Sequence, residues 1–391
     1  SALALHCFSN EYIYDQSSIN FELLRKLETM VELDLSKGKQ PNPKAILCLA
    51  SFCPLHKYKW INLLKINSYI NNVYDRQVIE VKEQISLKKT IKLLTEVKND
   101  ISSKVKSQYE DSPYPRWVNM GLLNKSSTVS KVIFDLKLNL YNNKIKNIKS
   151  PNILIAGCGT GKHSIETAKR FKNSNILAID LSLSSLSYAK YKSRKLGFSN
   201  IEYMQADILN LSKLGKKFDI IESIGVLHHM KNPIDGWKIL VDCLEDGGLM
   251  RIGLYSELAR QSIVKIRKEI LNLQNKFNNK QLIRFRNKVI FSEKEHHKHI
   301  RQSFDFYSLS EFRDLLFHVQ EERFTIPKID EAISKLGLHF CGFESSKIIK
   351  KFKSANSNLA DIYKLNEWIS FEESNKNTFA AMYQFWCQKK V

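Results

Sequence analysis

The sequence has little of what a membrane protein or a disulfide-bonded domain needs. No apolar run among its 391 residues approaches the roughly 18 that a membrane-spanning helix requires. Its seven cysteines include no Cys-x-x-Cys pair, which argues against a structural zinc site and against a disulfide framework. The first residues do not follow the basic, apolar and small-residue order of a secretory leader. We therefore expect a cytoplasmic protein without membrane association.

The chain does have enough apolar content for a sizeable core, and it carries a large excess of positive charge. Apolar residues make up 43% of the sequence, and its length exceeds that of one compact domain of about 150 residues. The formal net charge of +21 would suit a nucleic-acid surface. The basic residues are mostly lysines spread along the whole chain, which a compositional bias also explains. A nucleic-acid partner stays open but is not favoured.

A run of apolar residues that ends in a glycine-rich loop is the most informative feature. Residues 153–156 lead directly into glycines at alternate positions, Gly157, Gly159 and Gly161. The run predicts a buried parallel strand, and the residues after the last glycine predict the start of a helix. Glycines between them let the backbone turn sharply and let a ligand approach main-chain N–H groups. Alone, the pattern is typical of many nucleotide-binding proteins.

Acidic residues end the next two predicted strands. The second strand, at 175–180, ends in Asp180, and the third, at 201–207, ends in Asp207. An acid at the tip of the second strand of an open α/β sheet is placed to bind ribose hydroxyls. We expect Asp207 to accept a hydrogen bond from an adenine amino group. A fourth strand, at 218–229, is apolar and then breaks into small and polar residues.

With further strands predicted at 249–255, 337–343 and 379–387, these motifs resemble the class I S-adenosylmethionine-dependent methyltransferases. The resemblance is to the branch whose fourth strand ends like Gly-Val-Leu-His-His. It implies an α/β fold with a Rossmann-like seven-stranded sheet whose last strand is antiparallel. It also implies S-adenosyl-L-methionine as cofactor and S-adenosyl-L-homocysteine as product. The alternative is a dinucleotide-binding domain, but the third glycine comes one position early for Gly-x-Gly-x-x-Gly, which fits a ligand without phosphates.

The rest of the chain is expected to divide around this core. Residues 1–108 are predicted to form a helical N-terminal domain, 109–150 a linker or lid, and 151–391 the methyltransferase domain with a helical insertion at about 256–335. The segment Tyr-Glu-Asp-Ser-Pro-Tyr-Pro-Arg-Trp, which ends at Trp117, resembles bacterial methyltransferases with tetratricopeptide-type helices ahead of the catalytic domain. Residues 1–5 are typical of the middle of a helix, so we expect further residues upstream.

The resemblance and the strand ends define the expected site. We expect the cofactor to contact the ends of the first four strands: Ala156, Gly157, Cys158, Gly159, Gly161, His163, Asp180, Leu181, Asp207, Ile208 and Ser223. We expect the substrate to contact Tyr114, Arg116, Trp117, Phe306 and Tyr307. The segment ending at Trp117 and the basic insertion are predicted to close over the cofactor, the alternative being a packed linker.

The catalytic candidates follow the fourth and fifth strands. His228 and Tyr255 are placed to act as a base or as positioning groups, and His suits proton transfer near neutral pH. The alternative is that one histidine of the pair His228–His229 packs against the next helix while the other bonds the main chain. Methyl transfer is an in-line displacement that depends on alignment, so no invariant nucleophile is required.

A histidine cluster at 295–299 carries no metal prediction. His296 and His299 are three residues apart and could share a helix face, but no third ligand follows at a convincing spacing. The surrounding charge is basic, which disfavours cation binding. We predict a solvated polar helix end and no metal.

Several acceptor classes lose support because their motifs are missing. The fourth strand lacks the Asn/Asp-Pro-Pro-Tyr/Phe tetrapeptide of adenine and glutamine methyltransferases, and the sequence has neither a Pro-Cys nucleophile nor a paired-glutamate loop. A methyltransferase acting on an O, N or S atom of a small molecule or a protein side chain is therefore expected. A non-catalytic cofactor-binding or scaffold protein and an RNA methyltransferase using the basic surface stay open, as does a homodimer.

Overall fold

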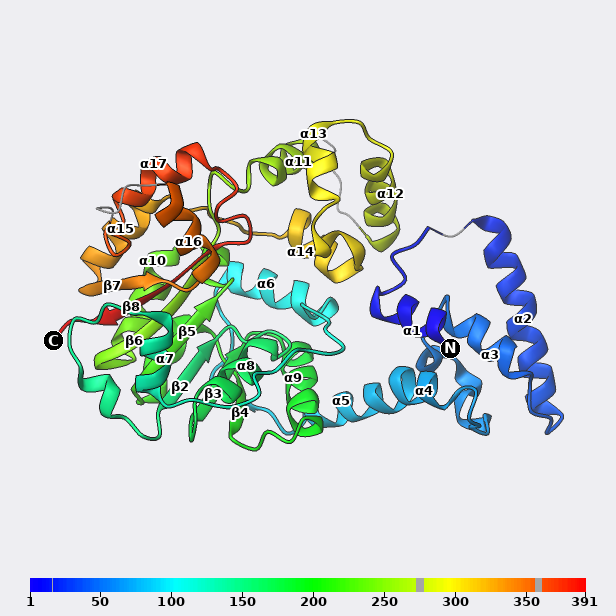
Figure 1. The fold of residues 1–391 in the computed structure, drawn as a ribbon. Helices are drawn as coiled ribbons and strands as arrows, with labels where there is room; N and C mark the ends of the chain where they lie inside the picture. The colour runs from blue at the N-terminus through cyan, green and yellow to red at the C-terminus, as the bar shows by residue number, and fades with distance from the viewer. Residues whose placement is uncertain (16, 272–277, 356–360) are drawn as a thin grey trace. The chain divides into compact units, whose positions relative to one another are not determined.

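The computed structural model describes residues 1–15, 17–271, 278–355 and 361–391 and divides the chain into two compact units. Unit 1 comprises Ser1–Lys89, Tyr114–Val118 and Lys265–Phe317, and unit 2 comprises Thr90–Pro113, Asn119–Val264 and His318–Val391. Figure 1 shows the course of the chain. None of the helices within these described ranges combines the length and the apolar composition that crossing a bilayer would need.

Unit 2 is built on a mixed sheet. Its strands are β1 (Lys92–Leu93), β2 (Asn152–Ala156), β3 (Asn175–Asp180), β4 (Ile201–Gln205), β5 (Phe218–Ile224), β6 (Leu244–Leu254), β7 (Leu338–Phe343) and β8 (Tyr383–Lys389). They lie in the order β1-β4-β3-β2-β5-β6-β8-β7, and β8 is antiparallel to both of its neighbours. The predicted Rossmann-like α/β fold and the antiparallel last strand are confirmed. The described sheet has eight strands where seven were predicted, because Lys92–Leu93 adds a short pairing to β4.

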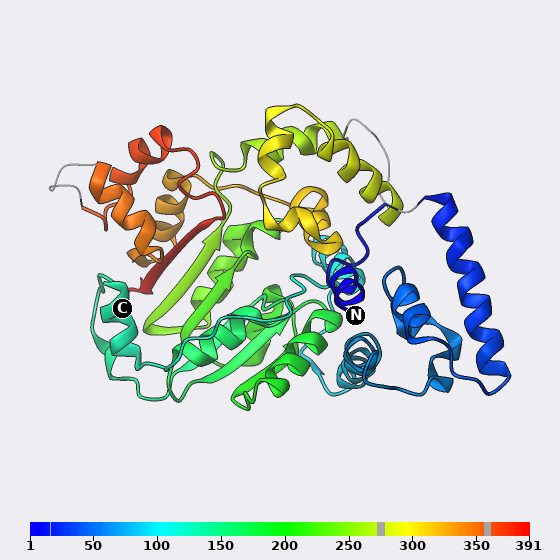
Figure 2. The same cartoon turned by 45° about the vertical axis from the view of Figure 1, so that its right-hand side comes forward.

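Helices cover both faces of this sheet, as the two views in Figures 1 and 2 show. They are α6 (Asp100–Asp111), α7 (Val129–Leu136), α8 (Lys162–Arg170), α9 (Leu183–Lys195), α10 (Pro233–Asp242), α15 (Ile326–Lys335), α16 (Ser346–Ala355) and α17 (Glu367–Ser374). Alternate residues of β2 enter different cores: Ile155 packs with Leu186 of α9, and Leu154 packs in the cluster that holds Trp237 of α10. A strand buried on both faces needs an apolar run without alternation, which is the pattern of 153–156.

Unit 1 is helical. Its helices are α1 (Ala2–Ser9), α2 (Ser18–Ser36), α3 (Pro43–Ala50), α4 (Asn71–Tyr74), α5 (Glu80–Lys88), α12 (Asn279–Ile290), α13 (Glu295–Ile300) and α14 (Leu309–Phe317), and α11 (Gln261–Leu271) crosses from unit 2 into unit 1. Ser17 caps α2 by accepting from the backbone N–H of Asn20 at 3.2 Å. The tetratricopeptide-type character of these helices and the predicted boundaries at 108 and 150 stay predictions.

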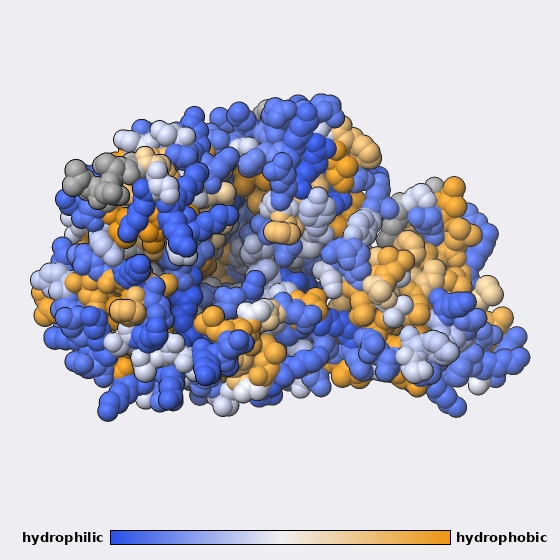
Figure 3. Space-filling view, in the orientation of Figure 1, coloured by the Kyte–Doolittle hydropathy of each residue, from blue (hydrophilic) through white to orange (hydrophobic). Residues whose placement is uncertain are grey.

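Hydrophilic residues cover most of the molecular face that Figure 3 shows, with apolar patches between them.

Candidate functional site

The glycine loop between β2 and α8 has a backbone that only glycine adopts easily. Gly157, Gly159 and Gly161 have φ values of 80°, 51° and 85°. A Cβ atom on Gly157 would lie 2.3 Å from Cγ2 of Val226, and one on Gly161 would lie 2.6 Å from Cβ of Ala189. The loop is therefore tight on the protein side, and its main chain is left to face a ligand.

Asp180, at the end of β3, is fixed by this loop. Its Oδ2 accepts from the backbone N–H of Gly159 at 2.8 Å, and its Oδ1 accepts from that of Ser182 at 2.9 Å. Burial raises the pKa of the carboxyl, the backbone N–H groups of Ser182, Gly159 and Leu181 lower it, and the charge of Glu110 raises it again, with a net upward shift. Each carboxylate oxygen can accept a further hydrogen bond, so both can still bind ribose hydroxyls.

Asp207, after β4, offers an unused acceptor. The residue is 3% exposed; its Oδ1 accepts from the backbone N–H of Leu209 at 3.0 Å, while its Oδ2 has no hydrogen-bond partner among the described residues. A buried carboxylate oxygen without a donor is costly unless a ligand supplies one. Asp207 borders a cavity of about 370 Å³ that Thr95, Lys98 and Asn99 also line. The position suits an adenine amino group, and the segment at 95–99 was not predicted to take part.

Glu110 is a second residue that the sequence did not reveal. From the end of α6 it accepts from the backbone N–H groups of Leu183 and Ser184 and from the Ser184 hydroxyl, the last at 2.6 Å. The Ser182 hydroxyl donates to the carbonyl of Tyr109 at 3.0 Å. A carboxylate at a helix N-terminus satisfies unpaired N–H groups and complements the helix dipole. This contact ties the end of α6 to the start of α9, three residues after Asp180.

His163, in the first turn of α8, is hydrogen-bonded to Glu222 of β5. Its Nε2 lies 2.5 Å from Oε2 of Glu222, which also accepts from Thr167 at 3.2 Å and from Arg251 at 3.3 Å. Burial raises the pKa of the Glu222 carboxyl, but the hydrogen bond and charge of His163, with the charges of Arg251 and Arg170, outweigh burial and hold the pKa well below 4.5. The predicted contact of His163 with the cofactor stays a prediction.

His228 lies fully buried beyond the end of β5. Its Nδ1 accepts from the backbone N–H of Tyr255 at 3.3 Å, and its ring stacks on that of Tyr255 at a centroid distance of 3.7 Å. The neutral ring therefore carries its proton on Nε2, and this atom has no partner among the described residues. Burial, followed by the charges of Arg260 and His318, lowers the pKa of His228 well below 6.5. With this geometry His228 is better suited to position a ligand as a neutral hydrogen-bond donor than to act as a base that removes a proton.

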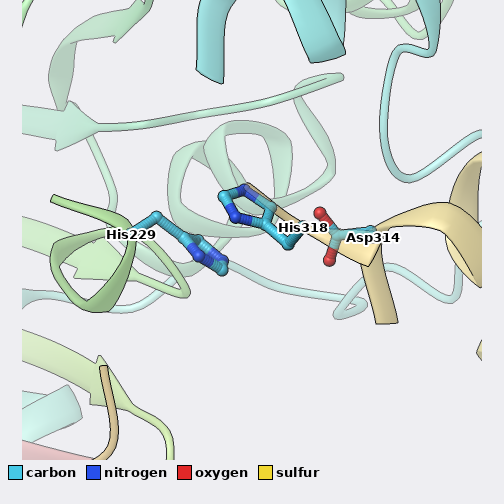
Figure 4. Close-up of side chains that lie close together, drawn as sticks. All are labelled: His229, Asp314 and His318. Atoms are coloured by element: carbon cyan, nitrogen blue, oxygen red, sulfur yellow. The ribbon is translucent and has the colours of Figure 1, made fainter. Parts of the chain in front are cut away.

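His229 differs from its neighbour. Its Nδ1 lies 2.7 Å from the carbonyl oxygen of Gln320, and its ring stacks on that of His318 at a centroid distance of 3.6 Å. Figure 4 shows His229 and His318 next to each other. Both histidines therefore bond the main chain, His228 through the N–H of Tyr255 and His229 through the carbonyl of Gln320. Sequence spacing gave no sign of His318, because 89 positions separate it from His229 along the chain.

Tyr255 is enclosed by a charged pair that was also missed. The Arg260 guanidinium lies over its ring at 3.5 Å and bonds both carboxylate oxygens of Glu321, at 3.1 and 2.7 Å. The side chains of Arg260 and Glu321 are buried, so each neutralises the other where water is scarce. The charges of Arg260 and Glu321 beside Tyr255 are thus paired with each other.

The remaining predicted residues fall into two groups. Ala156, Cys158, Leu181 and Ile208 lie at or close to the strand ends that carry the glycine loop, Asp180 and Asp207, and Ser223 lies near the end of β5. The five substrate candidates lie in unit 1, the cofactor candidates in unit 2. Within unit 1, Phe306 is buried against Phe312, and Arg116 pairs with Glu11 at 3.5 Å. A contact of these five residues with substrate stays a prediction.

The histidine cluster of α13 is not purely solvated. Glu269 of α11 lies 2.8 Å from Nε2 of His296 and 3.2 Å from Nε2 of His297, which is buried. The ammonium of Lys294 lies 2.8 Å from the same carboxylate and supplies its positive counter-charge. The expectation that the chain binds no metal stays a prediction.

Comparison with known proteins agrees with this site. A family model described as a methyltransferase domain matches residues 149–313. The uncharacterized protein syc1184_c of Synechococcus is 30% identical over 205 residues, which are 49% of this chain and 48% of that protein. (S)-coclaurine N-methyltransferase of Thalictrum flavum is 31% identical over 109 residues, which are 28% of this chain and 30% of that enzyme.

A solved structure, PKMT2 from Rickettsia typhi, aligns with a TM-score of 0.49 and 16% identity over 69% of this chain and 56% of that one. The match to this chain spans about half the length of the Synechococcus protein and 30% of the length of the Thalictrum enzyme. The glycine loop, the fixed Asp180 and the unused acceptor on Asp207 fit an adenosine cofactor without phosphates. Residues 149–313 match a methyltransferase domain, for which the cofactor is S-adenosylmethionine.

Proposed function

We propose that the whole chain transfers a methyl group from S-adenosylmethionine to an O, N or S atom of a small molecule or of a protein side chain. The observation that carries the proposal is the set of polar groups at the strand ends of unit 2. Asp180 is held between two backbone N–H groups, and a buried oxygen of Asp207 receives no hydrogen bond from the residues that the structure describes. A cofactor with free ribose hydroxyls and an adenine amino group supplies the missing partners.

The sulfonium of the cofactor supplies the activated methyl group, and the protein has to hold and align the two reactants. Asp180 would hold the ribose and Asp207 the adenine, while the backbone of the glycine loop would face the methionine end. His228 would donate from Nε2 to an electron-rich acceptor atom, because its other ring nitrogen is occupied by Tyr255. Tyr255 acts through His228 as a positioning residue, since its ring and backbone fix the imidazole.

A small molecule or a protein side chain is favoured as partner over nucleic acid, because the lysines are spread rather than grouped. The test is turnover of methyl-labelled S-adenosylmethionine by the full chain with fractionated cell extract, followed by mass spectrometry of the labelled product. We expect S-adenosylhomocysteine to form only with fractions that hold the acceptor. A labelled RNA would favour the nucleic-acid alternative.

A chain that binds S-adenosylhomocysteine yet transfers no label with any fraction would be a scaffold rather than an enzyme. A Gly159→Val variant serves as the control for background transfer, because its loop is expected to exclude the cofactor.

A further inference from the structure

A second cleft of unit 2 lies where the parallel strands of the sheet end, as the expected cofactor site does. It is at β7 and β8, away from the expected adenosine position at β2, β3 and β4. Its volume is about 480 Å³, which is within the usual range of small-molecule sites. It lies between the end of β7, the first turns of α16 and the segment that leads into β8. Its lining includes Phe343, Lys347, Lys351, Phe379, Met382 and Gln384. We name it the β7–α16 cleft.

The charged and amide groups that face this cleft are mainly hydrogen-bond donors. Lys347 and Lys351 lie four residues apart on α16 and line the cleft, and both are exposed; the ammonium of Lys351 lies 5.9 Å from the centroid of the Phe371 ring. Gln384 uses its Oε1 to accept from Arg251 at 3.0 Å, so its amide NH₂ is the half that is left to face a ligand. Two ammonium groups and an amide donor match a ligand that only accepts hydrogen bonds.

The acid in the cleft does not oppose this match. Glu344 is bound by Arg170 at 3.0 Å and by Arg251 at 3.2 Å through one oxygen, and by the indole N–H of Trp386 through the other. Its charge is therefore already neutralised within the protein. The lysines of α16 determine the sign of the cleft, which is positive.

Apolar side chains make up most of the remaining lining, and Ser345, Asn377 and Thr378 add polar groups to it. Phe343 and Phe379 are buried with tilted rings whose centroids are 4.9 Å apart, and Ile348 and Met382 are partly buried beside them. An apolar surface next to two cations suits a molecule with an apolar body and one anionic group.

Met382 connects the cleft with the candidate transfer site. A Cβ atom at Gly253 would lie 2.8 Å from its Sδ, and one at Gly225 would lie 3.7 Å from its Cε. Gly253 lies on β6 two residues before Tyr255, and Gly225 directly follows β5. The inner end of the cleft thus borders the strand ends that carry His228 and Tyr255.

We propose that the β7–α16 cleft binds the methyl acceptor and that this acceptor is a carboxylic acid with an apolar body. This rests on the proposed function. The carboxylate pairs with Lys347 and Lys351, and the accepting atom points past Met382. In the transfer the C–S bond of the sulfonium breaks with its electrons left on sulfur as a thioether. The new bond forms from a lone pair of the acceptor, and any proton on that atom leaves to solvent.

The test is binding of octanoate to the full chain, with octanamide and octylamine as uncharged and cationic probes of the same length. We expect calorimetry to show that octanoate binds and that both other probes bind about tenfold more weakly or not at all. A K347E/K351E double variant should lose octanoate binding by about tenfold or more. Lys350→Glu is the matched control, because this exposed lysine lies on α16 outside the cleft lining and should leave binding unchanged.

Failure of this proposal is distinguishable from failure of the proposed function. S-adenosylhomocysteine should bind equally to the wild-type chain and to the K347E/K351E variant, and circular dichroism should show that both are folded. The cleft proposal is overturned if octanoate does not bind, if octylamine binds as well as octanoate, or if Lys350→Glu matches the double variant. If the wild-type chain does not bind S-adenosylhomocysteine, the proposed function is overturned instead.

Discussion

At the scale of single residues, the cofactor assignment depends most on Asp180. Asp180→Ala removes a carboxylate whose oxygens are already oriented by two backbone N–H groups. We expect affinity for S-adenosylmethionine to fall by about 1–3 kcal/mol, the range for losing charged hydrogen bonds. Calorimetric titration measures this loss. Unchanged affinity in a folded variant would show that the ribose is bound elsewhere.

His228 gives a prediction about pH. Its pKa is lowered from 6.5, so the ring stays neutral as the pH falls from about 8 through 6.5, and its Nε2–H remains a donor. We expect kcat/KM to be flat through this range, whereas a histidine base with an ordinary pKa would give an acidic limb near 6.5.

Two variants separate positioning from proton removal. His228→Ala should lower kcat by about tenfold, and His228→Asn should recover part of it because its amide can also donate. An acidic limb near 6.5 that disappears in both variants would contradict the positioning role.

Sequence reasoning predicts residues at this scale where a motif fixes their position, as for Asp180 and Asp207. It does not find Glu110, His318 or Glu321, because their partners lie far away along the chain and no spacing links them. It also leaves the proton on His228 undecided, because the tautomer depends on the backbone N–H of Tyr255.

At the scale of elements, Glu222 links β5 to α8. Glu222→Gln leaves Arg251 and His163 near a neutral side chain, so we expect the free energy of unfolding at neutral pH to fall by about 3–5 kcal/mol. The native pKa is lowered, so the carboxylate's contribution is fully present above the unfolded pKa of about 4.5 and is lost progressively as the pH falls from there toward the lower native pKa.

Urea unfolding at several pH values measures this effect, with Glu202→Gln as control. Glu202 faces solvent and lies 3.7 Å from Lys92, so its loss should change stability by less than about 0.5 kcal/mol. Equal effects of the two variants would show that the buried contacts of Glu222 do not stabilise the link.

The loop between β2 and α8 gives the third prediction. Gly159→Val places a β-branched residue at a φ of 51° beside the expected cofactor, and we expect binding to be abolished while helical content is kept. Gly197→Val is the control, because Gly197 also has a positive φ, of 79°, but has no heavy atom within 4 Å of its Cβ position. Normal cofactor binding by the Gly159 variant would remove the loop from the cofactor site.

The strands were predictable as elements because most are apolar runs bounded by glycines or acids. The pairing of Lys92–Leu93 was not, since two exposed residues carry no periodic signal. The last strand begins at Tyr383 rather than near 379, because Thr378 bonds back to Asn375 in a turn.

At the scale of the whole molecule, each of the two units combines segments that are far apart in the sequence. Helices α12, α13 and α14 belong with the N-terminal helices in unit 1, although they are embedded in the second half of the chain. Periodicity predicts such helices but not the unit they join, because that depends on long-range packing. The cofactor residues, in contrast, belong to unit 2 alone.

The most direct test of the account is titration of S-adenosylhomocysteine into the full chain by calorimetry. The account predicts one binding event per chain, competition by S-adenosylmethionine, and loss of the heat in the Gly159→Val variant but not in Gly197→Val. Absence of binding by the folded wild-type chain, or binding that survives both Gly159→Val and Asp180→Ala, would contradict it.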